Sequence, residues 1–370
     1  MEGPLIDCSV HHRWATQAEL MEHMDAATRE YIGEPGSLPN GGGAIPVVFQ
    51  PTYRHPGGDD LRPDPAASAP IGTSAEEVAA ELFERRGFAS AVLCYGDPMM
   101  APAIPNPRLA QAVVRAANEW TVERWLELDP RFKALILVAS QTIPEAVAEI
   151  GRLAERDQVV GVLLAANALS HPFGHPIYRP IFEAAAGHGL TVVLQGGGDA
   201  IPEALSMPTA GGVPTAFGEY YALSVQAMTT HVVSLIGQGL FDFFPDLKVV
   251  VSGVGIGWVP ALFWRFDSEY IALRREVPWM RQPPSDYLRE HLYFCTHPLD
   301  RPADPGALVR LIEAFPGLDE RLVFGSGYPG WDSEWPAEVA ELLPGIAAAG
   351  AFADTARSAF PRLEPGAVLS

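Results

Sequence analysis

The sequence predicts an α/β fold in which one domain, residues 1–370, forms a (β/α)8 TIM barrel. Short apolar segments of strand length alternate with longer segments of helical periodicity along nearly the whole chain, and eight of them have strand character. Strands separated by helices pair in parallel through right-handed crossovers, and eight such units close into a barrel. A length of 370 residues suits one barrel with inserted loops, so no second domain is needed.

The predicted strands are apolar runs bounded by Gly, Pro or polar residues. In chain order they are expected at residues 5–11, 90–95, 134–139, 159–164, 191–195, 248–252, 292–296 and 321–325. Because active sites of this fold lie where the strands end, the residues just after each run are the functional candidates.

The predicted helices carry apolar residues at helical spacing. They are expected at residues 16–32, 74–86, 107–128, 144–155, 177–187, 219–239, 258–275 and 305–315, with further helices from 336 onward. Thr16 followed by Glu19 forms a candidate capping box for the first of these helices. The glycines at 253, 255 and 257 indicate a turn from a strand into a helix.

A long insertion over residues 33–73 follows the first strand and helix. It contains frequent prolines and three consecutive glycines at 41–43. This density of Pro and Gly opposes regular structure, and a loop of this length in a compact domain is usually functional. We expect it to serve as a lid over the active site or as an arm that contacts a dimer partner.

The composition is that of a globular protein, with 48% hydrophobic and 19% charged residues. The formal net charge of −20 opposes nucleic acid and anionic membranes as partners, because only 25 Lys and Arg residues are available to bind phosphates. Three widely spaced cysteines predict buried free thiols. Neither a leader nor an apolar run of membrane-spanning length is evident, so the expected location is the cytoplasm.

Several motifs resemble those of the amidohydrolase-related family, the group that contains the aminocarboxymuconate semialdehyde and γ-resorcylate decarboxylases. The stretch LVFGSGYPGWD at 322–332 resembles the family's closing motif, S-D-Y-P-H-W-D. Residues 171–175, HPFGH, are similar to its H-P-Y-G-H. Similarity to N-P-x-L, N-x-W, Y-x-P-I-Y-E-A-A, F-P-D-L-K-V and W-R-x-D is found at residues 106–109, 118–120, 178–185, 244–249 and 264–267. The resemblance covers almost the whole chain and implies the same barrel.

The resemblance also implies a metal site made by an acidic residue and a His on the first strand, a His on the fifth and an Asp on the eighth. Only His11 matches this pattern. Ser9, Gln195 and Gly327 occupy the other three positions, and Tyr221 stands where a further His would transfer a proton. An amide oxygen is a poor zinc ligand and glycine has no side chain, so the sequence predicts a divergent member with no metal and no other cofactor.

The side chains expected at the rim of the barrel still suit acid–base chemistry. We assign His11, His297 and Tyr221 as catalytic residues, because imidazole titrates near neutrality and a phenol can polarise a carbonyl. The expected substrate-binding residues are Arg13, Trp14, Gln195, His175, Cys295, Ser326, Tyr328, Trp331 and Asp332.

Three interpretations of this rim are open. The first, which we prefer, is a metal-independent lyase, decarboxylase, lactonase or cyclase that acts on a small organic acid or polyketide-like substrate in specialised metabolism. The second is a catalytically silent homologue that binds a ligand or supports an active relative in a heteromer. The third is a thiol nucleophile formed by Cys295 and His297, which lie two apart on one strand. The resemblance implies a homodimer, with residues 279–287 among the candidate contacts.

Overall fold

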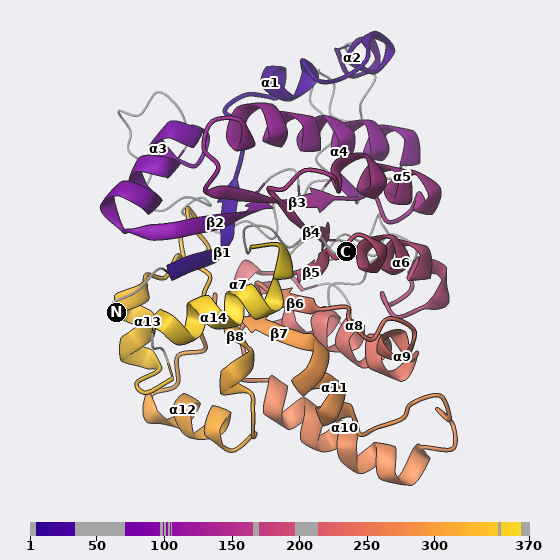
Figure 1. Cartoon of the computed structure of the whole chain (residues 1–370), viewed down its shortest axis with the longest axis vertical. Helices are drawn as coiled ribbons and strands as arrows, with labels where there is room; N and C mark the ends of the chain where they lie inside the picture. The colour runs from indigo at the N-terminus through magenta and orange to yellow at the C-terminus, as the bar shows by residue number, and fades with distance from the viewer. Residues whose placement is uncertain are drawn as a thin grey trace.

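The computed structural model describes residues 5–33, 71–96, 99, 101–102, 104, 106–165, 170–196, 214–346 and 349–363. Within these residues, eight parallel strands follow one another around one sheet in the order of the chain (Figure 1). The strands are β1 (Leu5–His12), β2 (Phe88–Tyr95), β3 (Phe132–Leu137), β4 (Val159–Leu164), β5 (Thr191–Gln195), β6 (Val249–Ser252), β7 (Leu292–Cys295) and β8 (Leu322–Val323).

Backbone hydrogen bonds join the last strand and its following loop to the first strand. Cys8 N donates to Phe324 O over 2.8 Å, Gly327 N donates to Ser9 O over 2.9 Å, and the amide of His11 donates to Tyr328 O over 2.7 Å. These bonds bring the two edges of the sheet together. The predicted (β/α)8 barrel is therefore confirmed.

Helices lie around the strands, with α4, α5 and α6 at the upper and right sides of Figure 1 and α10 and α12 at its lower end. The α-helices are α1 (Gln17–Met21), α2 (Ala26–Gly33), α3 (Ala75–Ala79), α4 (Pro107–Thr121), α5 (Ile143–Leu153), α6 (Arg179–Gly187), α7 (Phe217–Leu223), α8 (Val225–Gly237), α9 (Leu240–Phe243), α10 (Val259–Leu273), α11 (Pro284–His291), α12 (Gly306–Glu313), α13 (Pro336–Leu342) and α14 (Ala349–Ala359). None of the helices in the described part of the chain is long and apolar enough to cross a membrane.

The predicted first helix, 16–32, is wrong as a single element, because the chain leaves helical structure between α1 and α2. The capping box predicted for it is also wrong. The side chain of Thr16 makes no cap hydrogen bond, and the Glu19 carboxylate accepts instead from Ala15 N over 3.3 Å. By contrast, Asn106 does cap α4, since its Oδ1 accepts from the amides of the first helical turn, and Pro107 opens the helix.

The predicted insertion at 33–73 falls largely outside the described residues. Its last residues are described, and there Gly72 O accepts from Arg13 N over 3.1 Å. The insertion therefore rejoins the barrel next to the end of β1. Its expected role as a lid or dimer arm stays a prediction.

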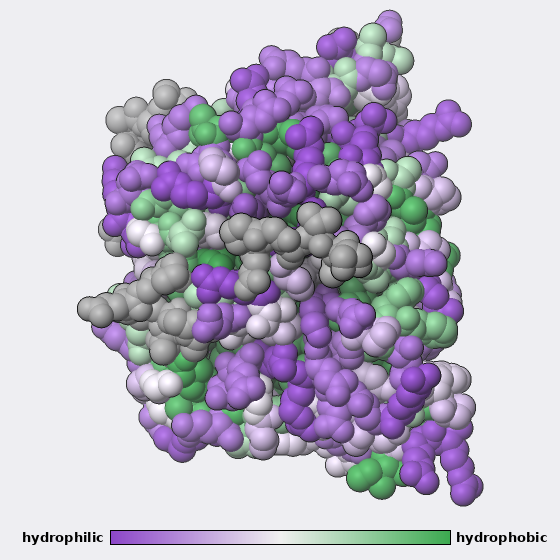
Figure 2. All heavy atoms as spheres, in the orientation of Figure 1, coloured by the Kyte–Doolittle hydropathy of each residue, from purple (hydrophilic) through white to green (hydrophobic). Residues whose placement is uncertain are grey.

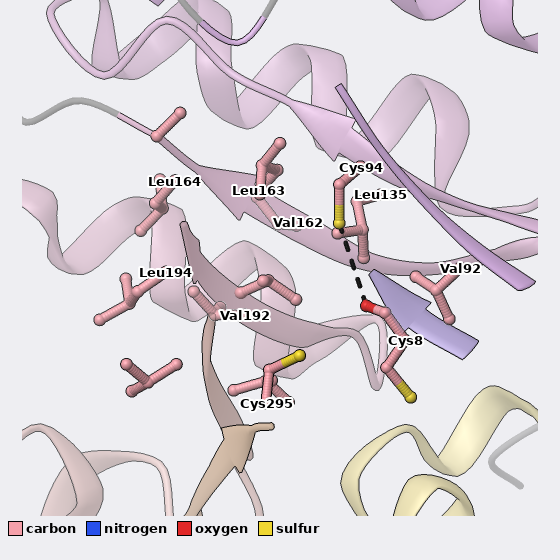
Figure 3. Packing of buried hydrophobic residues seen from close by; sticks show 14 of the residues in the cluster. Cys8, Val92, Cys94, Leu135, Val162, Leu163, Leu164, Val192, Leu194 and Cys295 are labelled. Atoms are coloured by element: carbon pink, nitrogen blue, oxygen red, sulfur yellow. Dashed lines mark hydrogen bonds between the residues drawn. The ribbon is translucent and has the colours of Figure 1, made fainter. Parts of the chain in front are cut away.

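All three cysteines lie in the core of the barrel (Figure 3), where they are free thiols. Cys94 Sγ points at Cys8 O at 4.0 Å. Burial raises the pKa of the Cys295 thiol to about 12 and raises that of Cys8 as well. Thiols in this environment stay protonated, which confirms the prediction of buried free thiols and argues against a thiol nucleophile.

A buried hydrogen-bond network around Asn118 ties α4 to two strands and to α5. Its Oδ1 accepts from Tyr95 Oη and Leu137 N over 2.8 and 3.0 Å. Its Nδ2 donates to Leu137 O and Glu149 Oε1 over 2.9 and 2.8 Å. Every polar atom of this buried amide is thus used, and its partners lie on three other elements.

Replacing Asn118 by alanine is expected to lower the free energy of unfolding by about 3 kcal/mol, because several buried partners lose their hydrogen bonds at once. Urea denaturation measures this change. Ser358→Ala is the control, since its exposed hydroxyl donates to the carbonyl of Asp354 on the same helix. The network has no structural importance if both variants unfold at the wild-type midpoint.

Candidate functional site

A pocket of about 260 Å³ opens where the strands end, and we call it the central pocket. Six of the strands, β1, β2, β5, β6, β7 and β8, contribute to it, directly or through the loop that follows them. Its lining residues are His11, Arg13, Gly96, Met99, Gln195, Gly196, Phe217, Tyr220, Tyr221, Ser224, Gly253, His297, Pro298, Gly327, Gly330, Trp331 and Asp332. The three residues predicted to be catalytic therefore line one pocket.

The imidazole of His297, in the loop after β7, occupies the space beside Gly327. Gly327 has a positive φ of 67°, and a Cβ atom on it would overlap the imidazole ring. A side chain at position 327 would therefore force His297 out of its observed position. The glycine in the closing loop and the histidine in the preceding loop thus form one local arrangement.

His297, Asp332 and Tyr221 contact one another at the wall of the pocket. Asp332 Oδ2 lies 3.4 Å from His297 Nε2, and Tyr221 Oη donates a short hydrogen bond to the same oxygen. Burial opposes charge on both members of the ion pair, but their contact prevails: it raises the pKa of His297 and lowers that of Asp332 to about 2. Burial and the Asp332 charge raise the pKa of Tyr221, which therefore remains a donor.

His11 is the second imidazole of the pocket, and its environment favours the neutral form. Burial and the nearby charge of His297 lower the pKa of His11 to about 4. Its Nε2 lies 3.2 Å from Ser9 Oγ. The environments of the two histidines thus push their pKa values apart, that of His297 upward and that of His11 downward.

Asp7 lies on the same strand as His11, and it was not among the residues predicted for the site. Asp7 is fully buried, and its Oδ1 accepts from Ser9 N and Ser326 N over 3.1 and 3.0 Å. Its Oδ2 has no hydrogen-bond partner among the described residues. Burial raises the pKa of this carboxyl to about 6. The sequence did contain a signal for Asp7, because an acidic residue inside an otherwise apolar predicted strand is unusual.

Because the folded pKa of Asp7 exceeds its ordinary value of 3.8, the folded state binds the proton more tightly, and folding stability is lost as pH rises from about 4 to about 6. Asp7→Asn is expected to remove this loss, which amounts to roughly 3 kcal/mol. Urea denaturation of both proteins between pH 4 and 7 measures the difference. Parallel stability curves over this range would contradict the prediction.

Gln195, at the end of β5, faces the pocket with an unsatisfied amide. It is buried, and its Oε1 has no hydrogen-bond partner among the described residues. A Cβ atom on Gly253 would lie 2.6 Å from Gln195 Nε2, so this glycine makes room for the amide. A buried acceptor without a partner is costly unless a ligand completes it.

The remaining residues predicted to bind substrate divide into two groups. Arg13, Trp331 and Asp332 line the central pocket, and Trp331 is 40% exposed. Trp14, His175, Cys295, Ser326 and Tyr328 do not belong to its lining. The wall also includes Phe217, Tyr220 and Met99, which the sequence analysis missed because they lie inside or before helices.

Packing explains why several of these side chains point elsewhere. Trp14 packs edge-on against Trp120, with ring centroids 6.2 Å apart. His175 stacks on His171 at 4.1 Å, and its Nδ1 accepts from Ile177 N. Tyr328 packs against Trp335, with ring centroids 5.6 Å apart. These residues order the loops around the pocket rather than its interior.

The family model described as Amidohydrolase matches residues 7–361. This match includes seven whole strands, β1 from Asp7 onward, and every residue that lines the central pocket. The chain belongs to the amidohydrolase family. The resemblance inferred from the motifs is thereby confirmed.

The relatives of this amidohydrolase include two decarboxylases. The γ-resorcylate decarboxylase of Rhizobium sp. (strain MTP-10005) is 25% identical over 232 residues, which cover 58% of this chain and 66% of the relative. The enzyme of the same name from Rhodococcus jostii (strain RHA1) is 24% identical over 238 residues, with 60% and 68% covered. The aligned region thus spans about two thirds of these relatives.

Solved structures share the fold over nearly the whole chain. The 5-carboxyvanillate decarboxylase LigW from Sphingomonas paucimobilis has a TM-score of 0.63 at 19% identity, with 97% of this chain and 99% of that chain covered. A dihydroxybenzoic acid decarboxylase from Polaromonas sp. JS666, solved with bound manganese, has a TM-score of 0.65 at 18% identity, with 100% of both chains covered.

The donor set of this amidohydrolase does not fit a metal ion of the kind bound by the Polaromonas structure. Within the described residues, no group of three His, Cys, Asp or Glu side chains could hold a metal. His11 has only Ser9 and the Gln195 amide as neighbours at the family's ligand positions. Gly327 offers no side chain, and the imidazole of His297 fills the space beside it and contacts the Asp332 carboxylate.

Proposed function

We propose that this amidohydrolase is a metal-independent lyase of the decarboxylase type, acting on a small hydroxylated aromatic acid. The observation that carries the proposal is a pair of histidines that line one pocket in contrasting environments. His297 contacts the Asp332 carboxylate, while His11 is kept neutral. Environments that push the pKa values of two titratable groups apart define an acid and a base.

His297 acts as the general acid. Neither of its ring nitrogens has a well-formed hydrogen bond within the described residues, so the imidazolium is available to a substrate. The proton passes from His297 to the ring carbon that carries the carboxylate. The bond between that carbon and the carboxylate breaks, its electron pair returns to the ring, and CO₂ leaves. Water then returns a proton to His297.

The other residues orient the substrate. The Gln195 Oε1 accepts a hydrogen bond from a phenolic hydroxyl of the substrate, which supplies its missing partner. His11, as a neutral base, accepts a hydrogen bond from a second hydroxyl of the substrate. This bond strengthens electron donation from the hydroxyl oxygen into the ring. Arg13 attracts the carboxylate. A volume of about 260 Å³ lies just below the usual range of ligand pockets, which suits an acid with one ring.

The relatives support decarboxylation over lactone opening or cyclisation, which the same side chains could also serve. Both relatives are named γ-resorcylate decarboxylases, and the similar structures include 5-carboxyvanillate and dihydroxybenzoic acid decarboxylases. The chemistry of the donor set supports a reaction without metal. A cytoplasmic location is part of the proposal and agrees with the three free thiols.

The test is CO₂ release from 2,6-dihydroxybenzoate and 5-carboxyvanillate by protein purified without added metal, with elemental analysis of the same sample. We expect turnover of at least one acid, insensitive to chelators. Near-stoichiometric zinc or manganese whose removal abolishes turnover would contradict the metal-independent reaction. Binding of the acids without any turnover would favour the silent homologue.

We also propose that the chain forms a homodimer. Figure 2 shows hydrophilic residues over most of one face and a hydrophobic group at its lower end, where α10 lies. The exposed apolar side chains on and after α10 include Trp264, Ile271, Leu273 and Trp279. Native mass spectrometry is expected to give twice the mass of one chain, and Ile271→Glu is expected to shift it toward the monomer.

A further inference from the structure

A second pocket of about 250 Å³, which we call the side pocket, adjoins the central pocket. The two share Tyr221, Ser224, Gly253 and Pro298 in their linings. The side pocket extends away from these four residues toward α10 and the loop after β7. A ligand in the central pocket therefore has a second space directly beside it.

The boundary between the two pockets includes a residue with no side chain. Gly253 has a positive φ of 80°, a backbone conformation that favours glycine. A Cβ atom there would press on the Gln195 amide at 2.6 Å. The absence of a side chain leaves the boundary open at this position, beside the group that we assign to substrate recognition.

The walls that belong to the side pocket alone are mainly apolar: they include Ala222, Val225, Val254, Trp258 and Leu299. Its two prominent polar groups are already engaged. Trp258 Nε1 donates to Gly255 O over 3.0 Å. Asp300 Oδ2 accepts from Ile256 N and Gly257 N over 3.0 and 2.7 Å.

The engagement of Asp300 depends on the glycines of this turn. Cβ atoms on Gly255 and Gly257 would lie 2.8 and 3.0 Å from Asp300 Oδ2, so side chains there would push the carboxylate away. The Oδ2 atom of Asp300 is thus taken up by two backbone amides, and most of the other residues in this wall are apolar. The space therefore suits hydrocarbon.

We infer that the substrate carries an apolar substituent, an alkyl chain or a second ring, that passes Gly253 and fills the side pocket while the acid and its hydroxyl bind in the central pocket. This inference rests on the proposed function, because the acid must occupy the central pocket. It selects substituted hydroxyaromatic acids over the parent one-ring acids. The carboxylate end is held by polar contacts and the substituent by burial of apolar surface.

The experiment measures binding by calorimetry for 2,6-dihydroxybenzoate and its 3- and 4-methyl, propyl and pentyl derivatives. The dissociation constant of the wild type is expected to fall about fourfold for each added carbon until the side pocket is full. Ala222→Phe fills this space from an exposed position on α7 and is expected to abolish the gain while the parent acid binds as before. Leu223→Phe, on the same helix but outside both linings, is the matched control.

The experiment measures binding without turnover, so it can contradict the side-pocket inference independently of the proposed decarboxylase function. A chain-length gain that disappears in Ala222→Phe supports the side pocket even when no CO₂ is released. A flat series in the wild type, or a gain that Ala222→Phe leaves unchanged, overturns the inference whatever the activity. If no acid of the series binds at all, the inference and the proposed function are both contradicted. Leu299→Val, which enlarges the space, should move the optimum to longer chains.

Discussion

A His297→Gln variant is expected to lose two to four orders of magnitude in kcat for decarboxylation, since a positioned general acid contributes about that much. Glutamine keeps hydrogen-bonding capacity but cannot deliver the proton to the ring carbon. The Asp332 carboxylate would also lose its cationic neighbour, 3.4 Å away in the wild type. Initial rates of CO₂ release measure the effect.

His175→Gln is the matched control, because this histidine stacks on His171 outside the central pocket. We expect it to retain the wild-type rate. Circular dichroism and the urea midpoint establish that both variants are folded. A His297→Gln enzyme with a rate within a few-fold of the wild type would assign the proton donor to another group and refute the mechanism.

Gly327→Ala is expected to remove activity and to destabilise the fold by roughly 2–5 kcal/mol. The methyl group would overlap the imidazole of His297, and φ of 67° is itself unfavourable for alanine. His297 must then leave its place beside Asp332. Urea denaturation and CO₂ release report the two effects.

Gly87→Ala separates the steric effect from the backbone effect. Gly87 has a similar φ of 74°, but an added Cβ there meets no atom within 4 Å. Its expected cost is only the backbone contribution of about 1–2 kcal/mol, with full activity. If Gly327→Ala behaves like Gly87→Ala in both measurements, the fit between Gly327 and His297 has no functional meaning.

The regular parts of the barrel could be predicted from local patterns. The boundaries predicted for 159–164 and 191–195 coincide with β4 and β5, because fully buried parallel strands form continuous apolar runs that stand out in the sequence. The helix expected at 219–239 is divided at Ser224 into α7 and α8, and α11 was not predicted. These departures arise from tertiary packing, which a local pattern does not contain.

Several residues of the candidate site could be predicted from the sequence, but the contacts between them could not. His297 attracted attention as a histidine after a strand, and Gly327 as the loss of a ligand. Gly327 makes room for the imidazole of His297, and this fit depends on contact between two separate loops. The spacing of the residues along the chain does not reveal such a contact. Similarly, the role of Asp332 follows from its shared contacts with Tyr221 and His297. The acid and base could be assigned only from burial and neighbouring charge.

The contacts that close the barrel have a consequence for biosynthesis. Asp7 accepts a hydrogen bond from the amide of Ser326, a residue 319 positions later in the chain. As the ribosome releases the polypeptide, β1 lacks its neighbour on one side until the residues around Ser326 have emerged. Such late pairing slows folding and leaves a strand edge open to other chains. Translation speed and chaperone supply are therefore expected to govern the yield of soluble protein more strongly than the final stability does.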